Sequence, residues 1–181
     1  MIKYFFISLL VLFCSKVASA QVTYQYDAAG NRIKRFSGPD LLPRISISPT
    51  LSHGISVIEI SVAVLNVGGA PTNGGNITVR VRKNSILSGF TWNANATSTV
   101  NGTSVQNSLY SPSEDDNYYL FNTTAVIPKN SQRRLLFSLT LTPGSTNGTF
   151  PLGVSIPSGG SGGEINLLNN LDSGIIDYFS N

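Results

Sequence analysis

Short runs in which apolar and polar residues alternate constrain this chain more than any other feature. Between residues 56 and 65, Ile58, Ile60, Val62 and Val64 alternate with other residues such as Glu59. This period of two predicts a strand that buries one face and exposes the other. Similar runs, divided by turn residues, predict further strands at residues 44–48, 77–82, 90–92, 118–127, 135–141, 150–156 and 174–179.

The spacing of these runs predicts an all-β fold, an immunoglobulin-like antiparallel β-sandwich over residues 41–181. Such sandwiches have about seven to nine strands in this length, and no stretch of the chain has useful helical periodicity. Residues 93–108 are mostly Asn, Thr, Ser and Gly, which predicts a long loop or an edge hairpin. Because long irregular loops in compact domains are often functional, we expect binding to take place there.

Residues 1–20 have the three parts of an export signal. Lys3 gives a positive start, residues 4–13 are apolar, and Ala18 and Ala20 form a small-x-small cleavage site before Gln21. The sequence therefore predicts a signal peptide and an exported protein, located extracellularly or on the outer cell surface.

Loss of this segment changes the chemistry of the chain. Cys14 is the only cysteine, so the exported form has no thiol and no disulfide; a lipoprotein signal with Cys14 as the lipidated residue is the alternative, against which bulky Phe13 precedes it. Without Lys3 and Lys16, ten of the twelve basic residues remain against nine acidic ones, so we expect no nucleic-acid partner. No other stretch reaches the ~18 apolar residues of a membrane span, so we expect no transmembrane helix in the mature chain.

Residues 21–40 differ in composition from the rest and are predicted to form a separate hairpin segment. Tyr24 and Tyr26 share one face of a strand, Asp27 is suited to cap a turn, and Gly30 and Asn31 suit positive φ. The stretch YQYDAAGNRI at residues 24–33 resembles the tyrosine-aspartate (YD, or Rhs) repeat. That family builds a hollow shell from many tandem copies, whereas this chain carries one copy, so the shell is not expected here.

Two turn motifs carry a second resemblance. The stretch LNVGGAPT at residues 65–72 and the stretch SGGEIN at residues 161–166, followed by Asn169 and Asn170, resemble the "N-x-G-x-A-P" and "G-G-E-x-N-x-x-N-N" turns of bacterial surface repeats. These are the immunoglobulin-like domain of unknown function eleven and the related cell-adhesion-related bacterial domains. The resemblance implies a stalk, spacer or adhesive module of an exported bacterial protein.

The residue inventory excludes several enzyme classes. His53 is the only histidine and lies beside no obvious nucleophile, which argues against Ser-His-Asp catalysis. One histidine without cysteine makes a zinc site improbable. The nine acidic residues leave open a carboxylate pair for glycan hydrolysis, because that pairing depends on distance in three dimensions. We expect a protein that is not an enzyme and that needs no cofactor apart from a candidate calcium ion.

The acidic run Glu114, Asp115, Asp116 and Asn117 supports the calcium hypothesis. Calcium takes several oxygen ligands from one loop, although the spacing fits no EF-hand. The alternative is a solvated acidic loop that keeps a sheet edge soluble.

Trp92, Tyr110, Tyr118 and Tyr119 lie in or beside the irregular middle region. Flat aromatic faces with nearby Asn and Asp hydrogen-bonding groups suit sugar recognition. The alternative is that Trp92 fills the core and the tyrosines line an edge strand.

Taken together, these features favour a non-enzymatic exported bacterial module in cell-surface adhesion or surface assembly. Its expected partner is a cell-surface protein or a polysaccharide. The second interpretation is a carbohydrate-binding module that uses Trp92 and the neighbouring tyrosines, and the third is a small glycan hydrolase.

Overall fold

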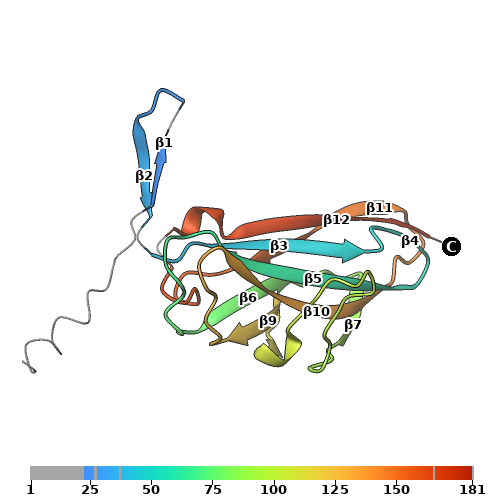
Figure 1. Ribbon diagram of the computed structural model, residues 1–181. Coiled ribbons are helices and arrows are strands. Elements are labelled where there is room, and N and C mark those ends of the chain that lie inside the picture. The colour runs from blue at the N-terminus through green and yellow to red at the C-terminus, as the bar shows by residue number, and fades with distance from the viewer. Residues whose placement is uncertain (1–22, 27, 37, 165, 181) are drawn as a thin grey trace, which may run out of the picture.

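The computed structural model describes residues 23–26, 28–36, 38–164 and 166–180. In this part of the chain, strands form a two-stranded, a four-stranded and a six-stranded sheet (Figure 1). Two single-turn 3₁₀ helices, η1 (Asn107–Leu109) and η2 (Leu167–Asn169), accompany them. The predicted all-β sandwich is confirmed.

The four-stranded sheet has the order β3-β5-β10-β7 and is antiparallel throughout. Its strands are β3 (Leu41–Ser48), β5 (Ser56–Asn66), β10 (Ser131–Leu141) and β7 (Leu87–Thr91). The two central strands, β5 and β10, pair over all eleven residues of each. The clean alternation of both strands in sequence explains this long, regular register.

The six-stranded sheet has the order β4-β12-β11-β6-β9-β8. Its strands are β4 (Leu51–His53), β12 (Leu171–Phe179), β11 (Gly148–Ser155), β6 (Ile77–Arg82), β9 (Tyr118–Thr123) and β8 (Ser111–Glu114). Only β4 and β12 run parallel; the other neighbours are antiparallel.

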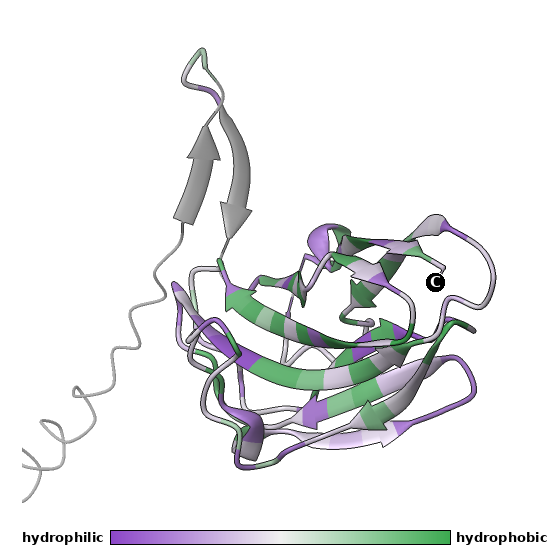
Figure 2. Ribbon diagram, turned by 90° about the vertical axis from the view of Figure 1, so that its right-hand side faces the viewer, coloured by the Kyte–Doolittle hydropathy of each residue, from purple (hydrophilic) through white to green (hydrophobic). Residues whose placement is uncertain are grey.

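The core lies between the inner faces of these two sheets. Ile58, Ile60, Val62 and Val64 of β5 are completely buried, as their alternation predicts. Aromatic rings add to this layer, and Phe121 of β9 lies 4.9 Å from Phe137 of β10, measured between ring centroids. Figure 2 shows the apolar segments in green along the strands of both sheets.

Two short strands at the sheet edges escape the sequence analysis, so the sandwich has ten strands where seven to nine were expected. One is β4, in which only Ser52 is buried, and the other is β8, whose four residues are all exposed. Neither has an alternating apolar pattern, because an edge strand of three or four residues contributes little to a core. Short strands and prolines such as Pro112 also protect sheet edges from pairing with other chains.

β3 and β12 lie side by side and connect the two sheets. The Ile45 amide donates to Asp172 Oδ2 at 2.9 Å near the start of both strands, and the Asp177 amide donates to the Thr50 carbonyl beyond the end of β3. The two strands therefore run in the same direction, and the chain enters and leaves the sandwich at opposite ends (Figure 1).

β1 (Thr23–Tyr26) and β2 (Arg32–Phe36) pair antiparallel with each other, and Gly30 in their connection has a φ of +82°. Residues 1–20, the predicted signal peptide, and Asp27, the predicted turn cap, lie outside the described residues. The described residues include no helix of the length and apolar character that crossing a bilayer requires.

Candidate functional site

The segment between β7 and β8, residues 92–110, forms the most elaborate loop of the sandwich and is called the middle loop below. Asn107, which is completely buried, joins its two ends: its Nδ2 donates to the Asn93 carbonyl at 2.7 Å and to the Leu136 carbonyl at 2.8 Å. Its Oδ1 accepts from the Leu136 amide at 2.8 Å. One carboxamide therefore replaces a missing strand partner along β10.

Gln106 extends this pairing by one more step. Its amide donates to the Arg134 carbonyl at 2.8 Å, and its Oε1 accepts from the Arg134 amide at 2.9 Å. Strand β7 pairs with β10 only from Ser138 to Leu141, so the middle loop takes over the edge of β10 where β7 has not yet begun.

The tip of the middle loop is held by a carboxylate from a distant strand. Both oxygens of Glu59, in β5, accept from the Val100 amide at 3.0 and 3.1 Å. A small turn supports this tip, with a bridge between Ser98 and Ser104 and a φ of +76° at Gly102. The sequence predicts a long loop or edge hairpin here, and the structure contains a loop fixed at its base and at its tip.

Hollows lie between the middle loop and the four-stranded sheet. The first, of about 380 Å³, is mostly polar and includes Thr91, Asn93, Asn95, Ser98 and Ser138 in its lining. The second, of about 340 Å³, is more apolar and includes Ala94, Ala96, Val105 and Leu109. The middle loop thus presents a polar groove and an apolar groove side by side, because residues 95–97 line both.

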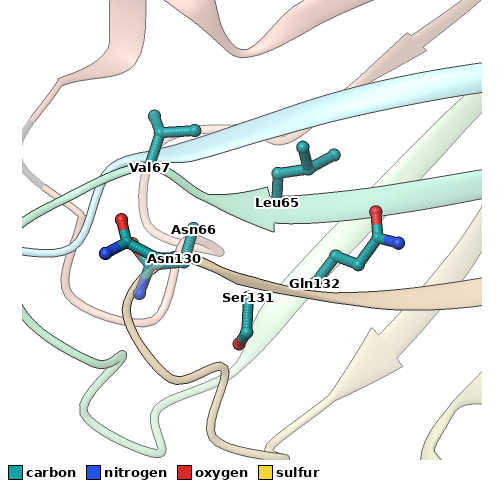
Figure 3. Close-up of a pocket in the computed structure, with 6 residues that line it drawn as sticks. All are labelled: Leu65, Asn66, Val67, Asn130, Ser131 and Gln132. Carbon is teal, nitrogen blue, oxygen red and sulfur yellow. The ribbon is translucent and has the colours of Figure 1, made fainter.

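A third hollow, of about 360 Å³, lies where β5 ends and β10 begins (Figure 3). Leu65, Asn66, Val67, Asn130, Ser131 and Gln132 line it. The carboxamide of Asn66 is fully used, because Oδ1 accepts from the amides of Asp40 and Gly68 and Nδ2 donates to the carbonyls of Ala70 and Ile127. This side chain therefore ties the predicted turn motif to the sandwich and is not available for a ligand.

The predicted aromatic site divides between the two faces of the six-stranded sheet. Trp92 is partly buried and lies 5.4 Å from Phe121, measured between ring centroids. Tyr119 is buried and stacks on Phe90 at 5.0 Å, and burial raises the pKa of its hydroxyl. Both rings belong to the aromatic layer of the core.

The other two tyrosines lie elsewhere. Tyr110 is buried, its hydroxyl has no hydrogen-bond partner among the described residues, and burial raises the pKa of that hydroxyl. Tyr118 follows the opposite phase of β9 from Tyr119 and faces the outside, where the guanidinium of Arg80 lies 5.8 Å from its ring centroid. The four rings therefore do not form one flat platform.

The predicted acidic run begins in β8 and continues into the turn before β9. Glu114 pairs with Lys83 at 2.8 Å, and this hydrogen bond raises the pKa of the lysine. Asp115 Oδ1 accepts from the amides of Asn117 and Tyr118 at 2.8 and 2.7 Å, and Asp116 is exposed. Among the described residues, no three His, Cys, Asp or Glu side chains come together as metal ligands.

His53 lies in β4 and not in a free turn. Its ring stacks on Phe179 of β12 with 5.1 Å between the centroids. The contact belongs to the pairing of these two strands, in which His53 is opposite Phe179.

Comparison with known proteins extends to the fold. A CARDB domain from Pyrococcus furiosus, solved in complex with di-metal ions, is 19% identical with a TM-score of 0.51, and the match covers 81% of this chain and 98% of that chain. A cohesin module from a family 33 glycoside hydrolase of Clostridium perfringens is 11% identical with a TM-score of 0.51, covering 79% and 99%.

The sequence comparisons add no assignment. No family model matches this sequence. No curated protein matches it either. The resemblance of residues 24–33 to a YD repeat is not supported by these comparisons. The chain is thus an immunoglobulin-like β-sandwich with structural similarity to CARDB and cohesin modules.

Proposed function

We propose that this chain is a non-enzymatic, exported bacterial module that acts in cell-surface adhesion or surface assembly by binding a protein through its middle loop. The observation that carries the proposal is the fixation of this loop by Asn107 at its base and by Glu59 at its tip. A loop held in this way loses little conformational entropy on binding, which favours affinity. Loops on a rigid scaffold are also where binding residues concentrate.

The composition of the loop surface supports a protein partner. The loop offers both a polar and an apolar groove, which suits the mixed surface of a protein better than a uniform polymer of sugars. No catalytic group of the usual kind supports an enzyme, because the single histidine is stacked on Phe179 and Glu114 is paired with Lys83.

A carbohydrate partner is the second candidate, for which one observation speaks. Trp92 is only partly buried and immediately precedes Asn93, which lines the polar groove. An aromatic face beside hydrogen-bonding side chains is suited to a sugar.

Binding to intact bacterial cells tests the proposal. The wild-type protein is compared with a variant in which residues 97–103 are replaced by a Gly/Ser linker, and with a control in which residues 143–147, between β10 and β11, are replaced in the same way. We expect the first variant alone to lose binding, and protease treatment of the cells to abolish binding of the wild type. Binding that survives protease and disappears with Trp92→Ala would favour the carbohydrate partner; binding unaffected by replacement of residues 97–103 would refute the role of the loop.

A further inference from the structure

Two carboxylates lie close together at the end of the sandwich where β3 begins. Asp40 is only 2% exposed, and Glu164 lies in the loop before η2, where its Oε1 accepts from the Leu41 amide at 2.6 Å. The pKa of Glu164 is raised to about 7, first by burial and further by the negative charge of Asp40. The ion pairs of Arg44 with Asp172 and of Lys83 with Glu114 involve neither acid.

Oxygen atoms converge on one point beside Asp40. Asn166 Nδ2 lies 3.2 and 3.3 Å from the two oxygens of Asp40 and 3.1 Å from Asn169 Oδ1. A carboxamide has two hydrogens, so one nitrogen faces three acceptors at long distances and satisfies at most two of them well. Such a convergence of oxygens is what a hard cation takes as ligands.

Asn170 gives an independent sign that this cluster lacks a component. The residue is 4% exposed, and its Nδ2 donates to Glu164 Oε2 at 2.7 Å. Its Oδ1 is buried without a hydrogen-bond partner among the described residues. A buried acceptor left unpaired costs free energy, and in native proteins it usually has a water or an ion as its partner.

We propose that this cluster binds one Ca²⁺ ion, with the carboxylate of Asp40 and the carboxamide oxygens of Asn166 and Asn169 as ligands and with Glu164 and Asn170 at its side. Carboxamides become ligands by a half-turn about their last torsion, which exchanges nitrogen for oxygen without moving the backbone. Calcium fits better than magnesium because it accepts irregular arrangements of six to eight oxygens, whereas Mg²⁺ demands a near-octahedral site.

The ion would tie the residue before β3 to the loop that leads into β12. It would brace the sandwich at this end, and the site is independent of partner binding by the middle loop. It is also distinct from the acidic run at Glu114, which the sequence singled out and in which Glu114 is paired with a lysine.

Calcium titration of the purified, EDTA-treated full-length protein tests the site. Calorimetry and thermal unfolding are followed with CaCl₂ and with MgCl₂. We expect one Ca²⁺ per chain with a Kd of about 0.1–1 mM, as in other extracellular modules, a rise of Tm with calcium concentration, and weaker binding of Mg²⁺. Asp40→Asn keeps the shape of the side chain and removes its charge, and we expect it to weaken calcium binding at least about tenfold.

Asp116→Asn, in the exposed acidic turn, is the matched control and should bind calcium like the wild type. No heat of binding and no shift of Tm up to about 10 mM CaCl₂, ten times the weak limit of the expected range, would overturn the proposal. Loss of binding in Asp116→Asn with full binding in Asp40→Asn would overturn it as well. If Asp40→Asn does not fold, Asn169→Ala removes a proposed ligand without changing the charge, and wild-type affinity in that variant would be equally decisive.

Discussion

At the scale of single residues, buried carboxamides hold the irregular parts of this sandwich to its sheets. Asn66 makes four hydrogen bonds around the turn after β5, and Asn107 makes three between the middle loop and β10. Burial of such a group is favourable only when its hydrogen bonds are satisfied, and both side chains are. Their partners belong to the backbone, so each acts as a substitute for a strand.

Replacement of Asn107 should therefore destabilise the protein. Asn107→Ala leaves the amide and the carbonyl of Leu136 without their partner, and we expect a loss of about 2–4 kcal/mol in the free energy of unfolding. Urea denaturation measures this value. Asn95→Ala, at an exposed position of the same loop, is the control and should change stability by less than about 0.5 kcal/mol; equal effects of the two substitutions would contradict the role given to Asn107.

Glu164 should make stability depend on pH. Its pKa is raised to about 7 in the folded protein from an ordinary value of 4.5, chiefly by burial, so the folded state holds this proton more tightly than the unfolded state. Its contribution is most favourable below pH 4.5 and is lost as the pH rises through 7. Urea denaturation in EDTA should show this decrease, and Glu164→Gln should reduce it; an unchanged pH profile in the variant would show that another group is responsible.

At the scale of elements, the central strands follow from sequence and the edges do not. The alternation around Ile60 and Phe137 predicts β5 and β10 because both strands bury one complete face. β8 has four exposed residues and no such pattern, so only its pairing with β9 makes it a strand. The middle loop was predicted from its composition, but its fixation was not, because Asn107 and Leu136 are 29 residues apart and Glu59 and Val100 are 41 apart.

The contact between β3 and β12 depends on a glycine. A Cβ atom at Gly174 would lie 2.5 Å from Ile47 Cδ1, whereas one at Gly153, in the neighbouring strand β11, would meet nothing within 4 Å. We expect Gly174→Ala to cost about 1–3 kcal/mol of stability by overpacking. Gly153→Ala should change the free energy of unfolding by no more than about 0.5 kcal/mol. Thermal or urea unfolding of the pair distinguishes them, and a harmless Gly174→Ala would mean that the two strands separate easily.

At the scale of the whole molecule, the chain enters at one end of the sandwich and leaves at the other (Figure 1). The nine residues of β12 span about 30 Å at 3.3 Å per residue. This arrangement suits a module that is placed in line with others, with its middle loop pointing sideways from the long axis. Exposed apolar residues, among them Leu51 and Ile175, lie on β4 and β12.

The central claim is that the middle loop binds its partner in the conformation in which the sheet holds it. Glu59→Ala tests it most directly, because this substitution frees the tip at Val100 without altering any residue of the loop. Binding to intact cells is measured for the wild type and for the variant, with circular dichroism to verify the fold. The account predicts binding weakened several-fold in a folded Glu59→Ala protein; a folded variant that binds as strongly as the wild type would contradict it.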